Sequence, residues 1–128
     1  MTTHECIKLQ QALTVLTEYC HKQSRDAGWW TDLSTGQPLV RNKGEMLMLI
    51  VTEVAEAMEG VRKNLQDDHL PEHKMETVEI ADTLVRLFDY IGGHGLEIAT
   101  AFTDKLEYNC VRQDHSVEHR QSANGKKC

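Results

Sequence analysis

LIVTEVAEAME, residues 49–59, combines helix-forming and apolar residues with three glutamates, Glu53, Glu56 and Glu59. The stretch contains neither proline nor glycine, which favours a helix over a strand. Asn42 precedes it, and a glutamate follows that asparagine three residues later, as in a helix-starting capping box. We therefore predict a helix that begins after Asn42 and ends at about Lys63.

The rest of the chain divides into helices and connections on the same grounds. Apolar residues at three- and four-residue spacing predict three further helices, over residues 3–22, from Pro71 to about 91, and from about 96 to 112. Turn-forming residues fill residues 23–42, which we expect to form a long loop of the kind that covers binding sites. Residues 113–128 are polar and aperiodic, and we expect a flexible tail there.

Composition limits the class of protein. The chain has 128 residues, of which 40% are hydrophobic and 27% charged, as in a single soluble globular domain. The net charge of -6 argues against a partner that presents a nucleic-acid backbone. The four cysteines form no CxxC pair, and no secretory or membrane-spanning segment is evident, so we expect reduced thiols in the cytoplasm.

Two acidic pairs are the strongest functional candidates. Glu53 and Glu56 lie three residues apart, as do Glu79 and Asp82, so each pair points to one side of its helix. The 22 residues between Glu56 and Glu79 are enough for a helical hairpin that brings the pairs face to face. Hard divalent cations such as Mg²⁺ or Mn²⁺ would relieve the repulsion among the four carboxylates.

The alternative for both pairs is a solvated helix surface. Helical geometry places Glu53 on an apolar arc, where an unpaired charge is costly; the arc contains Met46, Leu49, Ile50 and Ala57. The second pair is less distinctive. Glu79, Asp82 and Arg86 share one polar face, opposite an apolar face formed by Ile80, Leu84 and Leu87. That helix taken alone fits a solvated polar face equally well.

Two further groups are candidate substrate contacts. Lys105, Tyr108, Asn109 and Arg112 lie on one side of the last helix and could bind a polyphosphate, although cations also suit a solvated helix end. Trp29 and Trp30 lie in the glycine-flanked loop and could stack on a nucleobase, or one of them could fill the core.

Together these residues resemble the MazG-like, all-α nucleoside triphosphate pyrophosphohydrolase superfamily, over roughly residues 28–112. Its Glu-x-x-Glu and Glu-x-x-Asp motifs match Glu53 to Glu56 and Glu79 to Asp82, and its downstream Lys, Asn and Arg match Lys105, Asn109 and Arg112. The resemblance implies a four-helix bundle over residues 1–112, completed by assembly into a homodimer or homotetramer.

The resemblance also implies an activity: hydrolysis of a nucleoside triphosphate to the monophosphate and pyrophosphate with Mg²⁺ or Mn²⁺, two or three ions per site. We expect Glu53 or Glu56 to orient the attacking water, and Lys105 and Arg112 to stabilise the leaving pyrophosphate. Deoxynucleotides are favoured as substrates, with dGTP slightly ahead. The alternatives are a non-catalytic helical interaction module with the same fold and another metal-dependent phosphohydrolase, such as one that acts on a phosphorylated histidine-pathway intermediate.

Overall fold

The computed structural model describes residues 1–125 and is all-helical, which confirms the predicted fold class. Its helices are α1 (Thr3–Asp26), α2 (Lys43–Lys63), α3 (Met75–His94), α4 (Ile98–Val111), the short 3₁₀ helix η1 (Gln113–His115) and α5 (Val117–Gln121). The described residues form no β-strand, and their only β-pairings are two isolated bridges. None of the helices in this part of the chain is both long enough and apolar enough to span a bilayer.

The chain forms two compact units. One contains Leu16–Leu96, and the other combines Met1–Val15 with Glu97–Cys128. Helix α1 contributes to both units. The predicted division into a domain over residues 1–112 and a tail over residues 113–128 stays a prediction.

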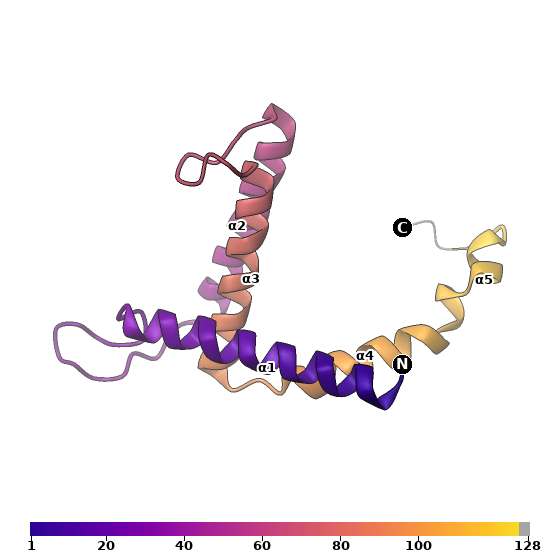
Figure 1. The fold of residues 1–128 in the computed structure, drawn as a ribbon, viewed down its shortest axis with the longest axis horizontal. Coiled ribbons are helices and arrows are strands. Elements are labelled where there is room, and N and C mark those ends of the chain that lie inside the picture. The colour runs from indigo at the N-terminus through magenta and orange to yellow at the C-terminus, as the bar shows by residue number, and fades with distance from the viewer. Residues whose placement is uncertain (126–128) are drawn as a thin grey trace. The chain divides into compact units, whose positions relative to one another are not determined.

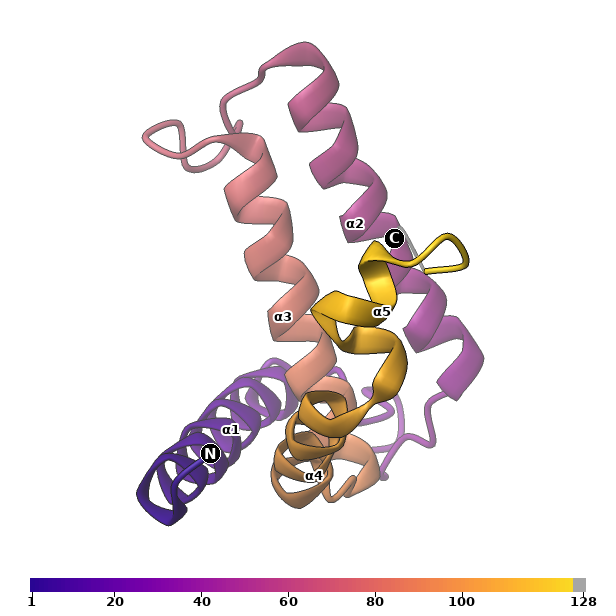
Figure 2. The ribbon, with the colours of Figure 1, turned by 90° about the vertical axis from the view of Figure 1, so that its right-hand side faces the viewer.

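Helices α2 and α3 form the framework of the first unit and run side by side in opposite directions (Figures 1 and 2). The side chain of Asn42 accepts a hydrogen bond from the Glu45 amide, so α2 begins at its predicted cap. Helix α3 ends at Gly95, which adopts a left-handed conformation with φ of 62°. The start of α3 was predicted wrongly. The helix begins at Met75, because Pro71 lies in a turn that the His73 amide closes by donating to the Leu70 carbonyl at 2.9 Å.

The faces of α2 and α3 that point toward each other carry carboxylates as well as apolar residues. Helix α2 buries the predicted arc, and its buried residues are Met46, Ile50, Glu53, Ala57 and Gly60. Gly60 allows close approach, because a Cβ there would lie 3.0 Å from the Met75 Cβ. Two alternatives were open for the acidic face of α3. Glu79 is buried, in agreement with the one that turns it toward α2, whereas Asp82 is exposed. The apolar residues Ile80 and Leu84 are exposed as well.

Residues 27–42 form an ordered connection that closes on itself. The Asp32 amide donates to the Gln37 carbonyl at 2.8 Å, and the Leu39 amide donates to the Trp30 carbonyl at 2.9 Å. Gly36 makes the turn between these pairs with φ of 72°, a conformation that favours glycine. The predicted loop is therefore a small closed hairpin, and α1 extends four residues beyond its predicted end, to Asp26.

The second unit is built from the beginning of α1, from α4 and from the segment that follows. Gln10 of α1 donates to the Thr103 hydroxyl of α4 at 3.0 Å, and Thr103 is the most deeply buried residue of the unit. The expected tail contains secondary structure, since η1 and α5 occupy most of residues 113–121. Its last three residues, 126–128, lie outside the described part of the chain.

We predict that Gly93→Ala destabilises the protein through a clash with Trp30. A Cβ at position 93 would lie 2.0 Å from the Trp30 ring, so the ring or the helix would have to move. The cost is about 1–3 kcal/mol in the free energy of unfolding, measured by urea denaturation. In a Trp30→Ala background the same change should be neutral or stabilising, since alanine favours helix. An equal cost in both backgrounds would show that the clash does not operate.

Candidate metal centre

Three glutamates converge where α2 and α3 face each other. One carboxylate oxygen from each of Glu53, Glu56 and Glu79 lies within 4.8 Å of the other two. Glu53 and Glu79 are buried, and Glu56 is exposed at the edge of the group. The predicted hairpin geometry is thus present for three of the four acidic residues. Carboxylate oxygens at this separation could hold a hard divalent cation.

The environment of Glu79 disfavours its charged form. Burial has the largest effect, and the Glu56 charge, a hydrogen bond with Glu53 and the charges of Glu53 and Asp82 add to it, so the pKa of Glu79 rises to about 7. A proton on Glu79 can therefore serve as the hydrogen between two carboxylates that would otherwise repel. A bound cation would supply the same neutralisation and release that proton.

Asp82 interacts electrostatically with this cluster, although its carboxylate is not one of the three that converge. Partial desolvation, the Glu53 charge and, more weakly, the Asp67 charge raise the pKa of Asp82, while the positive charge of Arg86 opposes the shift. Arg86 also donates from Nε to Glu53 Oε1 at 2.5 Å. Charge from both predicted acidic pairs is therefore concentrated around Glu53.

Asp67 is a buried carboxylate near this cluster that the sequence analysis missed. It lies in the connection between α2 and α3 and accepts hydrogen bonds from the amides of His69 at 2.9 Å and Leu70 at 2.7 Å. Those contacts explain its burial as a turn-stabilising residue. An aspartate that begins a short turn between two helices was the available signal.

Asp89 is a second buried carboxylate that the sequence analysis missed, and it differs from Glu79 in being well supplied with donors. It hydrogen-bonds to His21 Nδ1 at 2.9 Å, the Ser24 hydroxyl at 2.8 Å and the Trp30 indole N–H at 2.8 Å. It thereby ties the end of α1 and the closed hairpin to α3. The clue in the sequence was a single aspartate within the apolar run 87–91.

The pattern Glu18-x-x-His21 is typical of di-iron bundles, but here it does not join the carboxylate cluster. His21 is engaged with Asp89, and Glu18 is exposed.

The two tryptophans have different environments. Trp29 is exposed, whereas Trp30 is half-buried and packs edge-on against His21 and His94, with ring centroids 5.1 and 5.5 Å away. The Arg41 guanidinium lies over the Trp30 ring, 5.5 Å from its centroid. Trp30 is therefore held in place on several sides, which agrees with the core-filling alternative, while Trp29 is open to contact.

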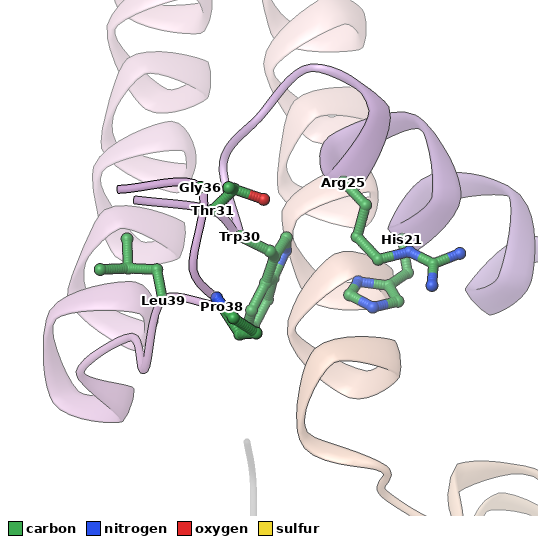
Figure 3. A pocket seen from close by; sticks show the side chains of 7 residues that line it. All are labelled: His21, Arg25, Trp30, Thr31, Gly36, Pro38 and Leu39. Carbon is green, nitrogen blue, oxygen red and sulfur yellow. The ribbon is translucent and has the colours of Figure 1, made fainter. Parts of the chain in front are cut away.

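A pocket of about 340 Å³ adjoins Trp30 and lies within the first unit (Figure 3). Its lining is formed by the end of α1 and the closed hairpin: His21, Arg25, Trp30, Thr31, Gly36, Pro38 and Leu39. Apolar walls with a few polar or cationic groups are typical of small-ligand sites of this size. Residue spacing gave no signal for this pocket, because its walls come from separate segments.

The four candidates on α4 gather in the second unit. Lys105 and Arg112 lie over the Tyr108 ring, 4.8 and 5.6 Å from its centroid. Arg112 also pairs with Asp114, and the buried Asn109 Oδ1 has no hydrogen-bond partner within the part of the chain that the structure describes. The hydrogen bond to Asp114 raises the pKa of the Arg112 guanidinium, so the group stays charged. Lys105, Tyr108 and Arg112 are therefore neighbours, and the role of all four residues in binding substrate stays a prediction.

We predict that Mn²⁺ affinity rises with pH through about 7, because the ion must displace the Glu79 proton. The expected increase between about pH 6 and about pH 8 is about tenfold, measured by calorimetry. Stability of the metal-free protein should change in the opposite direction. The folded-state pKa of Glu79 lies above its usual value. The stabilisation that protonated Glu79 gives to the folded protein is therefore present below about pH 4.5 and is lost as the pH rises through about 7.

Glu79→Gln is the control, because it is neutral at every pH. The variant should remove this pH dependence of stability. A stability profile identical to that of the wild type would contradict the assignment.

Comparison of the chain with protein-family models, with curated proteins and with solved structures finds no match in any of the three.

Proposed function

We propose that this chain is a metal-dependent nucleoside triphosphate pyrophosphohydrolase of the MazG-like kind. The observation that carries the proposal is the convergence of Glu53, Glu56 and Glu79 between two antiparallel helices, where burial and the neighbouring carboxylates raise the pKa of Glu79 to about 7. Arg86 pairs with Glu53, whereas the buried Glu79 has no cationic partner among the described residues. Such an arrangement is costly and is typical of a functional site. The resemblance of the two acidic motifs to that superfamily selects the reaction.

The donor set fits Mg²⁺ or Mn²⁺. All of the converging atoms are carboxylate oxygens, the ligand type that these hard cations prefer. Glu53, Glu56 and Glu79 would hold the first ion, and Asp82, whose charge interacts with Glu53, would join them in holding two or three. When bound, the ions supply charge neutralisation for the triphosphate and a water of lowered pKa.

The side chains of the chain then have distinct roles. Glu53 or Glu56 orients the water that attacks the α-phosphorus, as a carboxylate accepts its hydrogen bond. In the second unit, Lys105 and Arg112 supply positive charge of the kind that binds a pyrophosphate group, and Tyr108 and Asn109 offer contacts to sugar or phosphate. The free carbonyl oxygen of Asn109 supports this role, because a buried acceptor without a partner is suited to a ligand hydroxyl.

The pocket beside Trp30 is the proposed place for the nucleobase. Trp30, Pro38 and Leu39 offer apolar walls, and His21 and Arg25 offer polar contacts at its edge. Trp29, which is exposed, would cover the bound base. Deoxynucleotides remain the favoured class, with dGTP slightly ahead.

Assembly into a dimer or tetramer is part of the proposal. The outer face of α2 exposes Val51, Val54 and Met58, and α3 exposes Ile80 and Leu84. A helix that is apolar on its inner and outer faces requires burial on both. A second copy of the chain would cover these residues and complete a four-helix bundle.

We predict that the protein with Mg²⁺ or Mn²⁺ converts at least one nucleotide in a panel of all NTPs and dNTPs to the monophosphate and pyrophosphate. Glu53→Gln should lower the rate about a hundredfold or more, because it removes a negatively charged ligand. Chromatography of the products identifies both the reaction and the preferred base.

Glu59→Gln is the matched control, since Glu59 lies on the same helix and pairs with Arg62 and Lys63. It should keep wild-type activity. Release of the nucleoside diphosphate and inorganic phosphate, or no hydrolysis of any nucleotide, would overturn the assigned reaction.

We predict that the wild type sediments as a dimer or tetramer and that the double variant Val54→Lys and Met58→Lys shifts it to the monomer. Both positions are well exposed, at 48% and 58%, so the lysines do not disturb the hairpin core. Glu72→Lys introduces the same charge at an exposed polar position and should leave the assembly intact. A monomeric wild type would contradict the proposed assembly.

A further inference from the structure

Arg86 occupies an unusual position between the buried carboxylates and solvent. It lies one helical turn beyond Asp82 on α3, on the stripe that also carries Glu79. Its Nε donates to Glu53 Oε1, and Glu53 is only 10% exposed in its side chain, compared with 44% for Arg86. The guanidinium therefore reaches into the cluster at one edge while the rest of the side chain remains accessible.

The contact with Glu53 uses only part of the guanidinium. Nε is engaged, and the two terminal nitrogens have no hydrogen-bond partner among the described residues. A structural arginine buried to neutralise a carboxylate commonly binds with both arms of its planar fork. Arg86 instead keeps two donors for another anion.

Electrostatics limit how Arg86 can coexist with a bound ion. In the metal-free protein its charge offsets that of Glu53 and opposes the rise in the pKa of Asp82. A divalent cation held by Glu53 would compete with the guanidinium for the same carboxylate and would repel it. The long, half-exposed side chain can turn outward without moving α3.

We propose that Arg86 is a phosphate-binding residue that exchanges partners: it pairs with Glu53 in the metal-free protein and with the polyphosphate chain of the ligand once metal is bound. This inference rests on the proposed function. It assigns to Arg86 a direct contact with the phosphate chain, separate from the contacts proposed for Lys105 and Arg112. The planar fork of arginine suits the oxygens of adjacent phosphates, and a guanidinium stays charged at every physiological pH.

The test separates metal binding from phosphate binding. Mn²⁺ alone is titrated into the wild type, Arg86→Gln and Arg86→Lys, and inorganic triphosphate is then titrated into each Mn²⁺-loaded protein. Arg86→Gln should bind Mn²⁺ at least as tightly as the wild type, because its competitor for Glu53 is gone. Its affinity for triphosphate should fall about tenfold or more. The triphosphate affinity of Arg86→Lys should lie between those of the wild type and Arg86→Gln, because lysine keeps the charge and loses the planar fork of arginine.

Arg62→Gln is the control, since Arg62 is an exposed arginine on α2 that pairs with Glu59. It should bind Mn²⁺ and triphosphate as the wild type does. Circular dichroism establishes that each variant is folded. If Arg86→Gln unfolds, Arg86→Lys takes its place, because lysine keeps a cation beside Glu53. The Mn²⁺ and triphosphate titrations are then compared between Arg86→Lys and the wild type.

Two results would overturn the inference while leaving the proposed function in place. Loss of Mn²⁺ binding in the Arg86 variants would make Arg86 a residue that only positions Glu53. Unchanged triphosphate affinity would show that Arg86 does not contact phosphate. Failure of the wild type itself to bind Mn²⁺ would instead refute the proposed function, and the inference with it.

Discussion

The burial of Glu53 and Glu79 against each other is the constraint on which the rest of the site depends. Two carboxylates in a helical interface cannot both stay ionised and unpaired without a large cost in free energy. The chain meets this cost with a proton on Glu79 and with the guanidinium of Arg86 on Glu53. Both are replaceable by a divalent cation. The pair of helices α2 and α3 is thus suited to binding a divalent cation, since the ion takes over the charge neutralisation that burial of the two carboxylates already requires.

Asp89 shows what a structural carboxylate looks like in the same unit. It lies on the same face of α3 as Glu79, Asp82 and Arg86, and three side chains of the chain donate to it. Its partners come from α1 and the closed hairpin, so it holds those segments on α3. Among the described residues, no comparable set of side chains donates hydrogen bonds to the Glu79 carboxylate. Two buried acids ten residues apart therefore have different roles, and the number of donors separates them.

The elements that depend on local chemistry were predictable from the sequence. The start of α2 follows from the Asn42 side chain, and the end of α3 follows from a glycine in the left-handed conformation. The i, i+3 spacing correctly placed each acidic pair on one side of its helix. The apolar arc around Glu53 indicated that this residue would be buried, and it is.

Features that depend on tertiary pairing were not predictable. The sequence left open which face of α3 is turned toward α2, and the structure buries Glu79 while it leaves Ile80 and Leu84 exposed. The partners of Asp89 come from segments about 60 residues away, so no local pattern marks that residue. The pocket beside Trp30 likewise requires the closed hairpin, which forms through backbone contacts that side-chain spacing does not encode.

The most direct test of the central claim is anomalous diffraction from crystals of the wild-type protein grown with Mn²⁺. We expect anomalous density between α2 and α3, within ligand distance of carboxylate oxygens from Glu53, Glu56 and Glu79. Absence of density there at saturating Mn²⁺ and in the presence of a non-hydrolysable nucleotide, with the three carboxylates pointing apart, would contradict it.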